Sequence, residues 1–158
     1  MHTIPVSLTF LRRFLPSCAF FALLFCSQPA WAALGEDAAS IVADQAHLLA
    51  NLRIVRAELY TLHELEAKTG TKVREYLDSA GKVFAVSWQG PFRPNLRQLL
   101  GSYYESYLKA AGPRAARGPV NIQLPGLVIH MSGHQRAFYG RVYLADRVPQ
   151  GLATDEIQ

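Results

Sequence analysis

The sequence predicts an α+β domain. We expect an antiparallel sheet of about five strands in the order β-β-β-α-β-β, with a long amphipathic helix packed on one face and an N-terminal helix. Two observations lead to this fold class. Short segments rich in β-forming residues are separated by tight turns, which indicates hairpins and therefore antiparallel pairing. Apolar residues then recur at helical spacing from Leu96 to Ala111.

Residues 1–32 have the three parts of a secretory signal peptide. Arg12 and Arg13 form the positive end, residues 14–26 form an apolar stretch, and residues 30–32 (AWA) provide a small-x-small cleavage site. We therefore expect cleavage at the end of this segment and export by the general secretory route, so that the protein is periplasmic or secreted. A retained membrane anchor is the alternative, although no apolar run reaches the ~18 residues that a spanning helix needs.

Cleavage changes what the composition implies. The signal segment holds both cysteines and two of the 16 basic residues but no acidic residue, so its removal lowers the formal net charge from +4 to +2. The remaining chain can form no disulfide, and its small net charge argues against a nucleic-acid partner. Residues 33–158 are long enough to bury a core, and we expect them to form a single domain with no transmembrane segment.

Local patterns predict the first elements. Apolar residues at helical spacing indicate a helix over residues 37–52. Strands are expected over residues 59–66, 72–77 and 83–88, and the last two are joined by a turn at 78–81 that has Asp first and Gly fourth. This hairpin is the most regular strand pattern in the chain.

The amphipathic helix comes next. Asn95 is placed to cap its N-terminus, and Gly112-Pro113 is placed to end it. Its wide apolar stripe, which includes three tyrosines, would lie across the sheet. Two further strands complete the prediction: residues 120–131, interrupted at Pro125-Gly126, and residues 136–144, with a tight turn at Ser132-Gly133 between them.

Several sequence blocks resemble a known family. The blocks are VREY (73–76), GKVFAVSWQGP (81–91), LRQLLG (96–101), GPV (118–120), PGLV (125–128) and GHQRAF (133–138). In this order and spacing they are similar to a group of small exported bacterial proteins, the family called domain of unknown function 2844. The resemblance covers most of residues 33–158. It implies export and a single domain, and it brings no activity and no catalytic residue.

One alternative function is a metal-dependent hydrolase. His63 begins a near match to the zinc-protease motif, but Ala67 stands where the second histidine is needed. A metal site gathered in space would instead use His130 and His134 on either side of the expected turn, with His63 or Glu64 as a third ligand.

Paired carboxylates would be a second kind of catalytic site for a hydrolase. Glu64 and Glu66 share one face of an expected strand, about 6.6 Å apart by strand rise, and Glu75 lies on the next strand. Lys72 and Arg74 are close in sequence and favour ordinary ion pairs on a solvated face. No serine-hydrolase elbow, phosphate loop or dinucleotide fingerprint occurs in the sequence, and we expect no cofactor.

The last expected strand offers a contact face. If alternate residues point into the core, Tyr139, Arg141 and Tyr143 point outward beside Arg136. Tyrosine and arginine are the residue types that anchor interfaces, and a basic loop precedes these strands. The candidate contact residues are therefore Arg114, Arg117, Arg136, Tyr139, Arg141 and Tyr143. We predict a non-catalytic domain that binds an unknown protein or an envelope component; a purely structural oligomer subunit is a third possibility.

Overall fold

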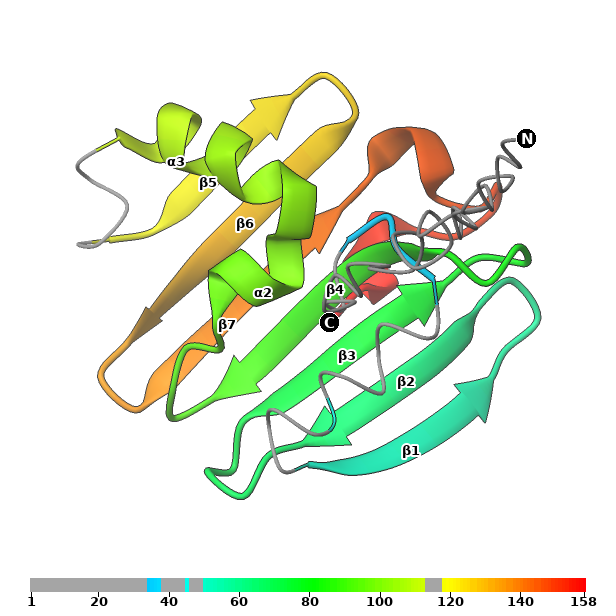
Figure 1. Ribbon diagram of the computed structural model, residues 1–158, viewed down its shortest axis with the longest axis horizontal. Helices are drawn as coiled ribbons and strands as arrows, with labels where there is room; N and C mark the ends of the chain where they lie inside the picture. The colour runs from blue at the N-terminus through cyan, green and yellow to red at the C-terminus, as the bar shows by residue number, and fades with distance from the viewer. Residues whose placement is uncertain (1–33, 38–44, 46–49, 113–117) are drawn as a thin grey trace, which may run out of the picture.

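The computed structural model describes residues 34–37, 45, 50–112 and 118–158. Its centre is one seven-stranded antiparallel sheet, with the strands in the spatial order β1-β2-β3-β4-β7-β6-β5 (Figure 1). Three predicted features lie wholly or mostly outside the described residues: the signal segment, the helix over residues 37–52, and the basic loop with Arg114 and Arg117.

The sheet is built from two meanders. The first contains β1 (Asn51–Arg56), β2 (Thr61–Glu66), β3 (Lys72–Leu77) and β4 (Val83–Gly90). The second contains β5 (Val120–Leu124), β6 (Leu127–His134) and β7 (Ala137–Tyr143). Between them in sequence lie α2 (Leu96–Leu100), η1 (Gly101–Tyr103) and α3 (Tyr104–Ala111), and β7 is followed by η3 (Ala145–Arg147) and η4 (Thr154–Glu156). Antiparallel pairing of β4 with β7 joins the meanders into one sheet.

The antiparallel sheet is confirmed, but the prediction of five strands is wrong because two strands were missed. The first of these is β1, which begins at Asn51 inside the range predicted as helix. Its residue Leu52 pairs with Leu65 of β2, so pairing with a neighbouring strand overrides the helical spacing. At the other end of that range, Asp37 forms an isolated antiparallel bridge with Lys82.

The second missed strand results from a displaced turn. Pro125-Gly126 does not merely interrupt a strand; it forms the turn between β5 and β6. β6 then continues through the expected turn at Ser132-Gly133, and the chain reverses at Gln135-Arg136, where Arg136 has a φ of 66°. Gly133 is needed for close packing within the hairpin, because a Cβ at this position would lie 2.3 Å from the Ala137 carbonyl oxygen.

The predicted caps of the helical segment are confirmed. The Asn95 side-chain oxygen accepts hydrogen bonds from the N–H groups of Arg97 (3.1 Å) and Gln98 (3.3 Å), and Gly112 ends α3. The single long helix is wrong. Gly101 has a φ of 50° and ends α2, so a 3₁₀ turn separates α2 from α3.

The sheet has two different faces. On the helix face, Val86, Trp88 and Ile129 pack with Leu100 of α2 and Tyr107 of α3. On the opposite side, which we call the tail face, the C-terminal segment packs against the sheet, and its residues Leu152 and Ile157 contact a smaller core. The residues of that core on the strands are Tyr76, Phe84 and Ala85. Figure 1 shows the helical segment in front of the sheet and the C-terminal segment behind it.

Candidate binding site on the tail face

A row of polar residues crosses the tail face of the sheet. Strand register places Arg74 of β3, Ser87 of β4, Arg141 of β7, His130 of β6 and Asn121 of β5 opposite one another in turn. Since side chains alternate between the two faces of a strand, all five share the tail face. The C-terminal segment lies along this row, because Arg74 donates to the main-chain oxygen of Gln158 (2.7 Å) and Arg141 donates to that of Thr154 (3.0 Å).

A pocket of about 560 Å³ lies over the β5–β7 end of this row. Strands β4, β5, β6 and β7 contribute to its floor, and Ile157 of the C-terminal segment contributes to its wall. This volume is within the range of ordinary small-molecule sites. The polar residues that line it include Gln89, Asn121, His130, Ser132, Arg141 and Gln158.

Arg141 supplies the positive charge of the pocket. Its side chain is half-buried, and its Nη1 donates to the Thr154 carbonyl oxygen at 3.0 Å, which fixes the guanidinium in place. No Asp or Glu is among the residues lining the pocket, and within the described ranges Arg141 forms no ion pair. Its remaining N–H donors are therefore available to an anionic group.

His130 and Asn121 form a polar pair beside Arg141. The Nδ1 of His130 lies 3.0 Å from the Asn121 side-chain oxygen. Burial, and secondarily the positive charge of Arg141, lower the pKa of His130, so the ring is neutral at pH 7. Because the asparagine oxygen is an acceptor, Nδ1 carries the proton and Nε2 is left as an acceptor.

Tyr139 stands at the rim of the pocket with 56% of its surface exposed. It also lines a second, smaller hollow of about 270 Å³, whose other residues include His134, Arg136 and Phe138. Gln89 lines both hollows as well. The two hollows are therefore neighbours that share Tyr139 and Gln89.

The structure gives the predicted orientation to the last strand. Tyr139, Arg141 and Tyr143 point to the tail face, and Val142 points to the buried helix face. Tyr143 is half-buried against the tail-face core, and Arg136 lies in the β6–β7 turn next to the smaller hollow. The structure thus brings Tyr139 and Arg141 together in one pocket.

The candidate metal ligands are not brought together. His63 points to the helix face and Glu64 to the tail face of β2, and three strands lie between β2 and β6, where His130 and His134 are found. His130 and His134 are both in β6 rather than on opposite sides of a turn. Within the described ranges, no group of three or more His, Cys, Asp or Glu side chains is placed to hold a metal ion.

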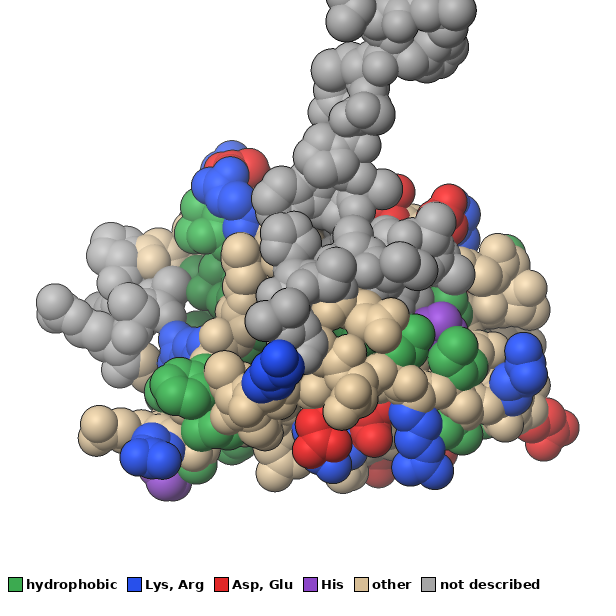
Figure 2. All heavy atoms as spheres, turned by 60° about the horizontal axis from the view of Figure 1, so that its bottom comes forward, with side chains coloured by type: hydrophobic (Ala, Val, Ile, Leu, Met, Phe, Trp, Pro, Cys, Tyr) green, Lys and Arg blue, Asp and Glu red, His purple; other side chains and the backbone are tan. Residues whose placement is uncertain are grey.

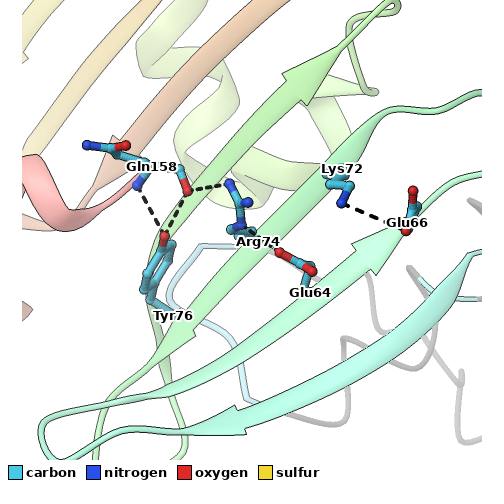
Figure 3. A network of polar contacts seen from close by, with 6 residues as sticks. All are labelled: Glu64, Glu66, Lys72, Arg74, Tyr76 and Gln158. Atoms are coloured by element: carbon cyan, nitrogen blue, oxygen red, sulfur yellow. Dashed lines mark hydrogen bonds and ion pairs between the residues drawn. The ribbon is translucent and has the colours of Figure 1, made fainter.

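The candidate carboxylates are engaged in ion pairs. Glu64 and Glu66 share the tail face as expected, but Glu75 points to the helix face. The Nε of Arg74 donates to Glu64 at 2.8 Å, and Lys72 lies 4.0 Å from Glu66 (Figure 3). The hydrogen bond from Arg74 lowers the pKa of Glu64, which makes this carboxyl a poor general acid at neutral pH. Figure 2 shows the same mixing of charges, with acidic and basic side chains next to one another.

Sequence reasoning missed part of the pocket. Asn121, Ser132 and Gln89 were not singled out, and His130 was considered only as a metal ligand. The alternation of side chains along β5 and β6 is the sequence signal that could have identified these residues. Asn121, His130 and Ser132 all fall on the polar side of their strands. Gln158 is far away in sequence, and no local pattern predicts its contact with the sheet.

The fold and the pocket define a small antiparallel-sheet protein with a helical cover on one face and a pocket lined by Arg141 on the other. The model of the family described as "Protein of unknown function (DUF2844)" matches residues 30–157, so the chain belongs to this family and the resemblance noted in its sequence is confirmed. No curated protein matches the chain. No solved structure matches it either. In the part of the chain that the structure describes, no helix is long and apolar enough to cross a membrane.

Proposed function

We propose that this chain is an exported, non-catalytic binding module that holds its partner on the tail face, in the pocket lined by Tyr139 and Arg141 of β7. The observation that carries the proposal is the 560 Å³ pocket, which joins the exposed ring of Tyr139 to the half-buried guanidinium of Arg141. Concave sites with an aromatic side chain and a few convergent polar groups are typical of binding sites, and Tyr and Arg are the residues that most often anchor them.

Export is part of the proposal and rests on the sequence of residues 1–32, with its positive end, apolar stretch and small-residue cleavage site. An exported module of this size would meet a protein or another component of the cell envelope. No contact among the described residues favours the alternative of a metal-dependent or carboxylate-based hydrolase. Glu64 is held by Arg74, and three strands separate His63 and Glu64 in β2 from His130 and His134 in β6.

The test is photo-crosslinking in the cell from position 139 of the exported protein, with the products identified by mass spectrometry. Leu108 provides the matched control, because it is 39% exposed but lies on α3, on the other side of the sheet. We expect a discrete product from position 139 that is absent from position 108.

Each result of this experiment has a clear meaning. A product that contains another protein or an envelope component supports the binding module. Products that contain only this chain would identify a homo-oligomer instead. Equal products from both positions, or none from position 139, would refute the contact face.

A further inference from the structure

One positively charged side chain, that of Arg141, lines the pocket. The other arginine of the polar row, Arg74, is ion-paired with Glu64, whereas Arg141 pairs with no carboxylate among the described residues. Its guanidinium is held in place by Thr154, and no acidic side chain lines the pocket around it. A half-buried guanidinium with donors to spare is suited to a carboxylate or a similar planar anion, which it binds through two parallel hydrogen bonds.

The surroundings of Arg141 are suited to hydroxyl groups. With its Nδ1 proton directed at Asn121, the Nε2 of His130 is an acceptor. Ser132 and Gln89 also line the pocket, and their side chains can both donate and accept. A ligand that carries several hydroxyls beside its anionic group would satisfy this set, whereas a simple inorganic anion would use only the arginine.

The rim provides a flat apolar surface. The exposed ring of Tyr139 stands beside the polar pocket, where the C–H face of a sugar ring can lie against the negative face of the aromatic ring. We propose that the pocket binds an acidic sugar unit, with its carboxylate on Arg141, its hydroxyls on His130 and its neighbours, and its ring against Tyr139. This inference rests on the proposed function and gives the chemical class of the envelope component.

A ligand with this chemistry has two sources: a free sugar acid, or one unit of an acidic polysaccharide. The smaller hollow, which shares Tyr139 and Gln89 with the larger pocket, provides room for a second unit and is lined by Arg136. A polymer would therefore extend from Arg141 past Tyr139 toward Arg136, whereas a free sugar acid would occupy only the larger pocket.

Titration calorimetry on the protein recovered after expression of the full chain tests the ligand class with galacturonate and with galactose, which lacks the carboxylate. We expect galacturonate to bind at least tenfold more tightly than galactose. Arg141→Gln should weaken galacturonate binding roughly ten- to hundredfold, as for the loss of a charge-assisted hydrogen bond. Arg56→Gln, which changes an exposed arginine of β1, should leave binding unchanged.

Arg141 also contacts Thr154, so a second variant separates binding from folding. Asn121 is exposed on an edge strand, and Asn121→Ala removes the partner that orients His130 together with one amide that lines the pocket. It should weaken galacturonate binding several-fold while the thermal unfolding midpoint stays the same. Equal binding of galacturonate and galactose, no binding of either, or unchanged binding by both variants would overturn the inference.

Trigalacturonate distinguishes the two sources. If it binds more tightly than the monomer, and Arg136→Gln removes only this gain, the ligand is a unit of a polymer; equal affinities identify a free sugar acid. If no acidic sugar binds while position 139 still captures a discrete partner, the ligand class is wrong and the binding module stands. If neither experiment succeeds, both proposals fail.

Discussion

The hydroxyl of Tyr76 in β3 donates to the main-chain oxygen of Gln158 (3.0 Å) and accepts from the N–H of the same residue (3.1 Å). Arg74, two residues earlier on the same face of β3, donates to that oxygen as well and also holds Glu64 (Figure 3). The C-terminal segment is therefore fastened to the first meander, although it leaves the sheet from β7 of the second meander.

The first prediction concerns this fastening. Tyr76→Phe keeps the ring in the tail-face core but removes both hydrogen bonds, so we expect the free energy of unfolding to fall by about 1–2 kcal/mol. Urea denaturation measures the loss, and amide exchange at Ile157 and Gln158 should become faster. Tyr104→Phe is the control, because the Tyr104 hydroxyl has no hydrogen bond within the described ranges. Equal losses in the two variants would contradict the role of the Tyr76 hydroxyl.

The second prediction concerns the ion pair of Glu64 with Arg74. Glu64→Gln should lower stability at pH 7 by about 0.5–1 kcal/mol, since both side chains are largely shielded from solvent. Glu66→Gln, which changes the exposed pair with Lys72, should have almost no effect.

The pH dependence of this pair has a definite sign. The hydrogen bond from Arg74 holds the pKa of Glu64 below its ordinary value of 4.5, so the folded carboxyl resists protonation. Its stabilising contribution is complete above pH 4.5 and is lost as the pH falls through the folded pKa. The difference between Glu64→Gln and the unaltered protein should therefore vanish in acid, and a difference that persisted there would show another cause.

The third prediction concerns His63. Burial on the helix face lowers the pKa of this ring below 6.5, so the unfolded chain takes up a proton that the folded chain does not. Stability should therefore decrease as the pH falls from 7.5 to 5.5. In His63→Leu, which is neutral at every pH, the decrease should be smaller. Thermal unfolding of the two proteins at both pH values measures the decrease, and an equal decrease in both would contradict the role of His63.

The fourth prediction concerns the contact of Gly140 with Trp88. These residues are opposite one another on β7 and β4, and a Cβ at position 140 would lie 2.2 Å from the Trp88 ring. Gly140→Ala must displace a buried indole, so we expect a loss of about 1–3 kcal/mol. Gly118→Ala meets no atom within 4 Å and should change stability by less than about 0.5 kcal/mol. The midpoints of urea unfolding of the two variants measure these losses, and equal midpoints would contradict the prediction.

Short sequence patterns predicted the structural features that depend on residues close together in the sequence. The Asp78 turn, the strands of the β3–β4 hairpin and the cap at Asn95 all follow from short spacings, and each is present in the structure. The β1 strand was missed because Leu52 fits a helical stripe as well as a strand, and only its pairing with Leu65 decides between the two.

The arrangement of the residues in the candidate site was predictable to a similar extent. Alternation along β7 placed Tyr139 and Arg141 on one face correctly. The register of three strands places Asn121 and His130 beside Arg141. The position of Gln158 in the pocket depends on its contact with Arg74, which is far away in sequence. Such long-range placements have no signature in a single sequence.

The β4–β7 pairing has a consequence for how the chain folds. Every other strand pair in the sheet joins consecutive strands, so each meander can form early from contacts that are close in sequence. The β4–β7 pairing must instead close a loop that contains the helices, β5 and β6. We therefore expect this closure to limit the folding rate, with Trp88 and Gly140 meeting in the transition state and the pocket beside Arg141 forming only after the two halves have joined.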